Sequence, residues 1–182
     1  MKRAAVLAPG YGGTAEQPIL RKLESALDEF DIASRAVTFR TSGSRPSKDY
    51  VSEIEDLRAA RDALRAAGCE RVALVGRSFG GRMCAFLAEQ EPPDALVILG
   101  HPIAPPDRPR LRDEAALAAT TCPTLVVQGE KDELGPFAVL ERIAAKNPRV
   151  DLVRIAGAGH DFGASEREAV VAAARWLDSV LR

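Results

Sequence analysis

The sequence has little cysteine, little histidine and almost no net charge, and each shortage narrows what the protein can be. Its three cysteines, Cys69, Cys84 and Cys122, are an odd number without metal-site spacing, which favours a reducing compartment and no bound metal. The formal net charge of -1 argues against a general nucleic-acid binder. Only two histidines, His101 and His160, are available for acid–base chemistry.

Long hydrophobic runs are also absent, so no stretch is expected to cross a membrane. The apolar run that follows Met1-Lys2-Arg3 stops at Pro9-Gly10, which is too short for the core of a secretory signal. We therefore expect a cytoplasmic protein without a membrane or nucleic-acid partner. With 46% hydrophobic and 28% charged residues, the composition is that of an ordinary globular protein.

Apolar runs alternate with helical patterns along the whole chain. About six strands are expected, among them 4–8, 34–39, 72–76, 95–99, 124–128 and 150–155. The first helix is expected to begin between Thr14 and Pro18 and to reach Phe30, and a second runs from Ser47 to Gly68. A third follows the strand at 72–76 and ends at about Gln90, and three more cover 114–120, 136–146 and 165–180. This alternation predicts an α/β fold with a mainly parallel sheet and helices on both faces, forming one domain over residues 1–182.

One stretch carries a chemical signature. The apolar run 72–75 stops at a Gly-x-Ser-x-Gly pentapeptide, residues 76–80, and a helical pattern follows. A strand, a sharp turn and a helix in this order hold the central serine, Ser78, on a strained bend with its hydroxyl exposed. Gly76 and Gly80 are required because a side chain at either position would collide with a neighbouring strand or helix.

A serine hydroxyl needs an adjacent base, and the base needs an acid that orients it. His160 lies in a Gly-Ala-Gly turn after the last expected strand, and His101 is the other histidine. Asp132 follows the preceding strand and is the expected acid, with Glu130 and Glu133 as rivals in the same turn. The order Ser78, Asp132, His160 is the one found in α/β-hydrolases.

Three segments, 76–82, 123–132 and 157–162, together resemble the α/β-hydrolase superfamily, and more closely its small dienelactone-hydrolase-like members. His101-Pro102 followed by Pro105-Pro106 is similar to the branch that contains a testis-expressed protein and the third subunit of a histone-acetyltransferase NSL complex. The resemblance implies an α/β-hydrolase fold without a large cap domain. It also implies an oxyanion hole formed by the backbone N–H groups of Tyr11 and Phe79.

The combined prediction is a serine hydrolase that cleaves a small ester or thioester without a cofactor. A non-catalytic scaffold on the same fold is the alternative, and a perhydrolase or lyase using the same residues is a third. His101, Arg77 and Arg40 are named as residues that could contact substrate, and the arginines would then favour an acidic acyl group. The competing interpretations are a turn histidine satisfied by backbone and solvated arginines on a cleft wall.

Overall fold

A single parallel sheet organises the chain in the computed structural model, which describes all residues from Met1 to Arg182. The order of the strands is β2-β1-β3-β4-β5-β6, and every neighbouring pair is parallel. After β2 the chain therefore crosses β1 and continues in the other direction. The strands are β1 Arg3–Ala8, β2 Ile32–Ala36, β3 Arg71–Arg77, β4 Ala95–Leu99, β5 Thr124–Gly129 and β6 Val150–Ile155.

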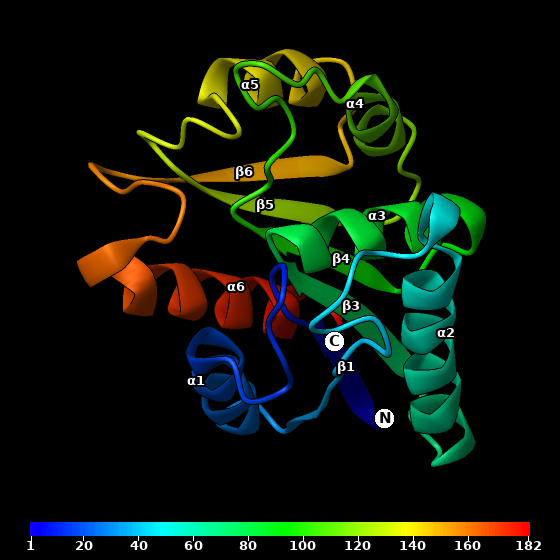
Figure 1. Cartoon of the computed structure of the whole chain (residues 1–182). Helices are drawn as coiled ribbons and strands as arrows, with labels where there is room; N and C mark the ends of the chain where they lie inside the picture. The colour runs from blue at the N-terminus through cyan, green and yellow to red at the C-terminus, as the bar shows by residue number, and fades with distance from the viewer.

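Helices cover both faces of the sheet, as Figure 1 shows. Two of them, α1 and α6, pack together on one face, and the other four cover the opposite face. Consecutive strand residues point to opposite faces, so neighbouring positions such as Val72 and Ala73 enter different cores. The helices are α1 Pro18–Asp28, α2 Val51–Ala66, α3 Phe79–Gln90, α4 Leu111–Ala118, α5 Phe137–Ala144 and α6 Glu166–Val180.

The expected six-stranded parallel sheet with helices on both faces is confirmed, and no large cap covers it. The second strand differs from the expected 34–39, because it begins at Ile32 and ends at Ala36. The first helix begins at Pro18, at the end of the expected interval, and the Gln17 side chain before it accepts from the Gly10 N–H. None of the helices combines the length and the apolar character needed to cross a bilayer.

The last helix begins at Glu166, within one residue of the expected start, and Ser165 and Glu168 form no capping box. Ser165 ends a 3₁₀ turn, Gly163–Ser165, and its side chain makes no cap hydrogen bond. The preceding residue Phe162 has a left-handed backbone (φ 62°), so the chain enters α6 through a tight turn rather than from an extended residue. That turn carries the chain from the His160 loop back onto the sheet.

Candidate active site

Ser78 stands between β3 and α3 with an unusual backbone, φ 49° and ψ −113°. Such a conformation costs of order 1–3 kcal/mol and persists only where the surroundings enforce it. A Cβ on Gly80 would lie 2.5 Å from the carbonyl oxygens of Ala8 and Pro9, and one on Gly76 would overlap the start of α3. The glycines thus allow β1, β3 and α3 to meet closely around the serine, as the pentapeptide predicts.

The three residues singled out from the sequence lie in contact. Ser78 Oγ is 2.8 Å from His160 Nε2, and His160 Nδ1 is 2.7 Å from Asp132 Oδ2. Because the carboxylate can only accept, Nδ1 carries the proton and Nε2 is left free to accept from the serine hydroxyl. His160 is partly exposed, whereas the Asp132 side chain is fully buried.

Four hydrogen-bond donors fix the Asp132 carboxylate. Besides His160, the backbone N–H groups of Leu134 and Gly135 donate to Oδ1 at 2.9 and 3.3 Å. The Gln128 amide donates to Oδ2 at 2.9 Å. A carboxylate with this many donors has little freedom to rotate, so it presents one oxygen to the imidazole.

Gln128 is the last side chain of β5 before Gly129, and it is completely buried. Its Oε1 accepts from the His101 N–H at 2.7 Å, and its Nε2 lies within 3.1 Å of the carbonyl oxygens of His101 and Gly135. It thereby ties the end of β4 to the turn that carries Asp132. The signal in the sequence is a polar residue that ends a buried apolar strand.

The rival acids and the rival base lie elsewhere. Glu130 accepts from the Gly157 N–H at 2.8 Å, and Glu133 is exposed without a hydrogen bond to the protein. His101 has no exposed surface, and neither of its ring nitrogens has a partner. Burial and the nearby charge of Arg82 lower the pKa of His101 to about 3, so it stays neutral.

The expected substrate contacts of His101, Arg77 and Arg40 do not match where these residues lie. His101 is sealed in the core, as just described. Arg77 is buried, and its guanidinium donates to the carbonyl oxygens of Leu99 (3.1 Å) and His160 (2.7 Å). Burial lowers the pKa of the Arg77 guanidinium below its ordinary value. Its partners are the last carbonyl of the neighbouring strand β4 and the carbonyl of His160, so Arg77 supports the loop that carries His160.

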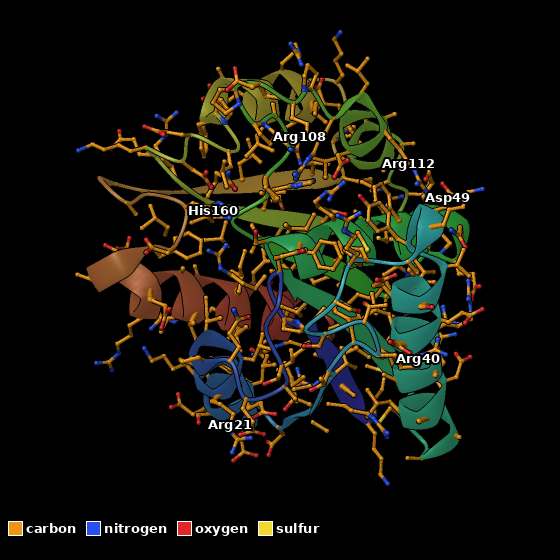
Figure 2. The ribbon with its side chains drawn as sticks, viewed as in Figure 1. Arg21, Arg40, Asp49, Arg108, Arg112 and His160 are labelled. Carbon is orange, nitrogen blue, oxygen red and sulfur yellow. The ribbon has the colours of Figure 1, made fainter.

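Arg40 points away from the site altogether. It pairs with Asp56 at 2.6 Å and Glu55 at 3.1 Å, both on α2. Figure 2 shows it against α2, well apart from His160 and Arg108. Neighbouring carboxylates on the helix therefore satisfy this arginine, which is closer to the solvated interpretation than to a substrate contact.

The loop after β1 borders the serine. Gly10 to Gly13 form a turn closed by a 2.9 Å hydrogen bond, with Gly12 at φ +69°. The ring of Tyr11 meets the ring of Phe79 edge to face, 5.7 Å between centroids. Neither the Tyr11 N–H nor the Phe79 N–H donates to a protein acceptor. Both amide groups are therefore available to a ligand, and their role as an oxyanion hole remains a prediction.

A cleft of about 670 Å³ opens over Ser78. One wall comes from the loop after β4, and Figure 2 shows Arg108 on this loop. A second wall, which the sequence did not suggest, comes from Pro46 and Tyr50 before α2. No group of three or more His, Cys, Asp or Glu side chains is arranged to hold a metal ion. The cleft is lined by Tyr11, Pro46, Tyr50, Ser78, Phe79, Arg82, Pro102, Arg108, Pro109, Arg110 and Leu134.

Comparison with known proteins places this geometry in context. The family model of an alpha/beta hydrolase domain matches residues 1–180. Among curated proteins no sequence gives a significant match. An α/β serine hydrolase homologue from Coxiella burnetii shares 25% identity and a TM-score of 0.80, covering 95% of this chain and 85% of that chain.

Two further solved structures share the fold. A dienelactone hydrolase from Anabaena variabilis is 24% identical with a TM-score of 0.81, covering 100% of this chain and 88% of its own. An α/β serine hydrolase without a lid from Xanthomonas campestris is 22% identical with a TM-score of 0.78, covering 96% and 82%. With a family model matched over nearly the whole length and the hydrolase sheet in place, the chain belongs to the α/β-hydrolase domain family.

Proposed function

We propose that this chain is a serine hydrolase that cleaves a small ester or thioester through an acyl-enzyme. The observation that carries the proposal is the continuous contact from Ser78 Oγ to His160 Nε2 and from His160 Nδ1 to Asp132. A serine so connected is activated for attack, whereas a structural serine needs neither the base nor the acid.

In the first half of the reaction, Ser78 Oγ attacks the acyl carbon while its proton passes to His160 Nε2. The negative oxygen of the tetrahedral intermediate accepts from the N–H groups of Tyr11 and Phe79, each such donor giving about 10²–10³ in rate. Asp132 holds the imidazole and stabilises its positive charge. His160 then gives the proton to the leaving alcohol or thiol, and the acyl group stays on Ser78.

Water completes the cycle. His160 removes a proton from a water molecule, whose oxygen attacks the acyl carbon, and the same proton then returns to Ser78 Oγ as the acid leaves. The cleft is open and carries no large cap, so we propose short or compact acyl groups rather than long lipid chains. The dienelactone hydrolase and the lidless serine hydrolase among the structural neighbours are consistent with such chemistry.

We assign the chain further to the small, dienelactone-hydrolase-like branch that includes the third NSL-complex subunit. The support is the His-Pro sequence at 101–102 with Pro105-Pro106 after β4. In the structure this segment forms part of the cleft wall through Pro102. This branch is also the source of the alternative function, because a complex subunit with this fold can act as a non-catalytic scaffold.

A fluorophosphonate probe tests the proposal directly, because it labels only an activated serine. Wild-type protein should be labelled and Ser78→Ala should not. The control variant Ser179→Ala, which removes an exposed serine of α6, should be labelled like the wild type. Turnover of p-nitrophenyl acetate should fall roughly 10³-fold or more in Ser78→Ala and in His160→Ala. A folded wild-type protein that neither labels nor turns over would favour the non-catalytic scaffold.

A further inference from the structure

Every polar side chain that lines the cleft can donate a hydrogen bond, and none of the lining residues is an aspartate or glutamate. Three arginines, Arg82, Arg108 and Arg110, contribute to its walls. A cleft with positive charge and no negative charge of its own is complementary to an anionic ligand. Only those arginines that lack a carboxylate partner inside the protein can offer their charge to such a ligand.

Arg82 is neutralised. Its guanidinium forms a two-pronged pair with Asp113 of α4, at 2.5 Å from Nε and 3.2 Å from Nη2. Both partners are buried, and the pair joins α3 to α4 beneath the cleft. Arg82 therefore shapes the wall but offers no uncompensated charge to a ligand.

Arg108 and Arg110 are not neutralised, because no carboxylate of the protein lies within ion-pair distance of either. Arg110 is half-buried, and the single hydrogen bond of its guanidinium runs from Nη1 to the carbonyl oxygen of Pro102 at 2.9 Å. Burial and the neighbouring charges of Arg82 and Arg108 lower the pKa of Arg110. An anion beside this guanidinium would relieve the repulsion and fill its remaining donors.

Tyr50 supplies a neutral donor on the facing wall. Its hydroxyl oxygen accepts from Arg82 Nη2 at 3.3 Å, and its own hydrogen has no acceptor on the protein. The backbone at Asp49 and Tyr50 is left-handed (φ 53° and 59°), a costly conformation for two consecutive side chains. In this conformation the Tyr50 ring stacks on the ring of Phe86, with 5.7 Å between centroids, and lines the cleft.

We propose that Arg110, Arg108 and the Tyr50 hydroxyl form a subsite for a carboxylate group carried by the ester substrate. The inference rests on the proposed hydrolase function and adds its substrate class. The carboxylate accepts from the fork of Arg110, while Arg108 at the exposed rim adds attraction. From the sequence, Arg77 and Arg40 were the arginines that could contact an acidic acyl group, whereas this proposal gives that role to arginines of the loop after β4.

Two matched ester pairs test this subsite. Mono-4-nitrophenyl adipate and 4-nitrophenyl 6-methylheptanoate share one skeleton, and only the first carries a carboxylate, on its acyl part. The esters 4-acetoxybutanoate and 4-methylpentyl acetate differ in the same way on the alcohol part. In at least one pair we expect kcat/KM to be roughly tenfold or more higher for the anionic ester, the scale of a charge-assisted hydrogen bond.

Variants locate the effect. Arg110→Gln should lower the anionic-to-neutral ratio of kcat/KM by about tenfold, and Arg108→Gln should lower it less, because Arg108 is exposed. Arg149→Gln is the matched control, since this exposed arginine precedes β6 at the opposite edge of the sheet. The anionic-to-neutral ratio of kcat/KM for Arg149→Gln should equal that of the wild type. Because the Arg108 side chain is exposed and makes no hydrogen bond within the protein, its variant keeps the test valid if Arg110→Gln misfolds.

Three results would overturn the inference. Equal kcat/KM within both pairs, with the neutral esters hydrolysed, would remove the subsite and leave the hydrolase function standing. An anionic preference that survives both Arg110→Gln and Arg108→Gln would place its origin elsewhere. Absence of turnover for all four esters, together with no labelling by a fluorophosphonate, would refute the proposed function and the subsite with it.

Discussion

The buried His101 should make the free energy of unfolding depend on pH. Its imidazole is fully enclosed, and burial together with the charges of Arg82 and Arg110 lowers its pKa from 6.5 to about 3. The folded protein therefore keeps His101 neutral at pH 5, whereas the unfolded chain protonates it below 6.5. Since the folded pKa is the lower one, the stability that His101 contributes is present above pH 6.5 and is lost as the pH falls toward 3.

The size of the effect follows from the two pKa values. Below pH 6.5 the free energy of unfolding should fall by about 1.4 kcal/mol per pH unit because of this residue alone. Between pH 7 and pH 5 the loss is about 2 kcal/mol, and the result hardly changes if the folded pKa is one unit higher. For a chain of this length, about 2 kcal/mol corresponds to roughly 4–8 °C in Tm.

Urea unfolding at pH 7, 6 and 5, followed by circular dichroism, measures this loss. The His101→Phe variant has no titrating group at the position, so its stability should fall by about 2 kcal/mol less than that of the wild type over this range. His101→Gln, also neutral throughout, serves as a second variant if the phenylalanine does not fit. Wild-type and variant stabilities that change in parallel with pH would refute the buried, neutral histidine.

Two further predictions concern the supports of the site. Gln128→Glu replaces the N–H that donates to Asp132 with an oxygen, so kcat for p-nitrophenyl acetate should fall roughly 10- to 100-fold. The same change at the exposed Gln90 should have no effect. Equal rates for both variants would contradict the role of Gln128. Asp113→Ala leaves the buried charge of Arg82 unpaired and should cost about 3–5 kcal/mol in urea unfolding, most of it recovered in Arg82→Met/Asp113→Leu. A single variant as stable as the wild type would show that Arg82 finds another partner.

Local patterns sufficed to predict the architecture and the contacts at its centre. Ser78, Asp132 and His160 each follow an apolar strand, and parallel strands bring their carboxyl ends to one edge of a sheet. The expected meeting of the three side chains therefore needed only strand positions. The need for Gly76 and Gly80 was equally predictable, because a sharp turn between a strand and a helix leaves no room for a side chain on either flank.

The lining of the cleft could not be predicted in the same way. Arg77 and Arg110 look alike in the sequence, yet one is buried against the carbonyl oxygens of Leu99 and His160 and the other faces the cleft. Their orientation depends on partners 22 and 83 residues away for Arg77, and such contacts leave no local pattern. Tyr50 ends a short 3₁₀ turn, Lys48–Tyr50, directly before α2, and a turn of this length has no periodicity that indicates which way a ring points.

The position of Arg77 has a mechanical consequence. It is the last residue of β3, directly before Ser78, and its guanidinium donates to the backbone carbonyl oxygen of His160. The guanidinium of Arg77 thus links the end of β3 to the loop of His160, although the two residues are 83 positions apart in the sequence. Movement of the turn would therefore remove a hydrogen bond from the buried guanidinium of Arg77, so the position of His160 is coupled to packing at the end of β3.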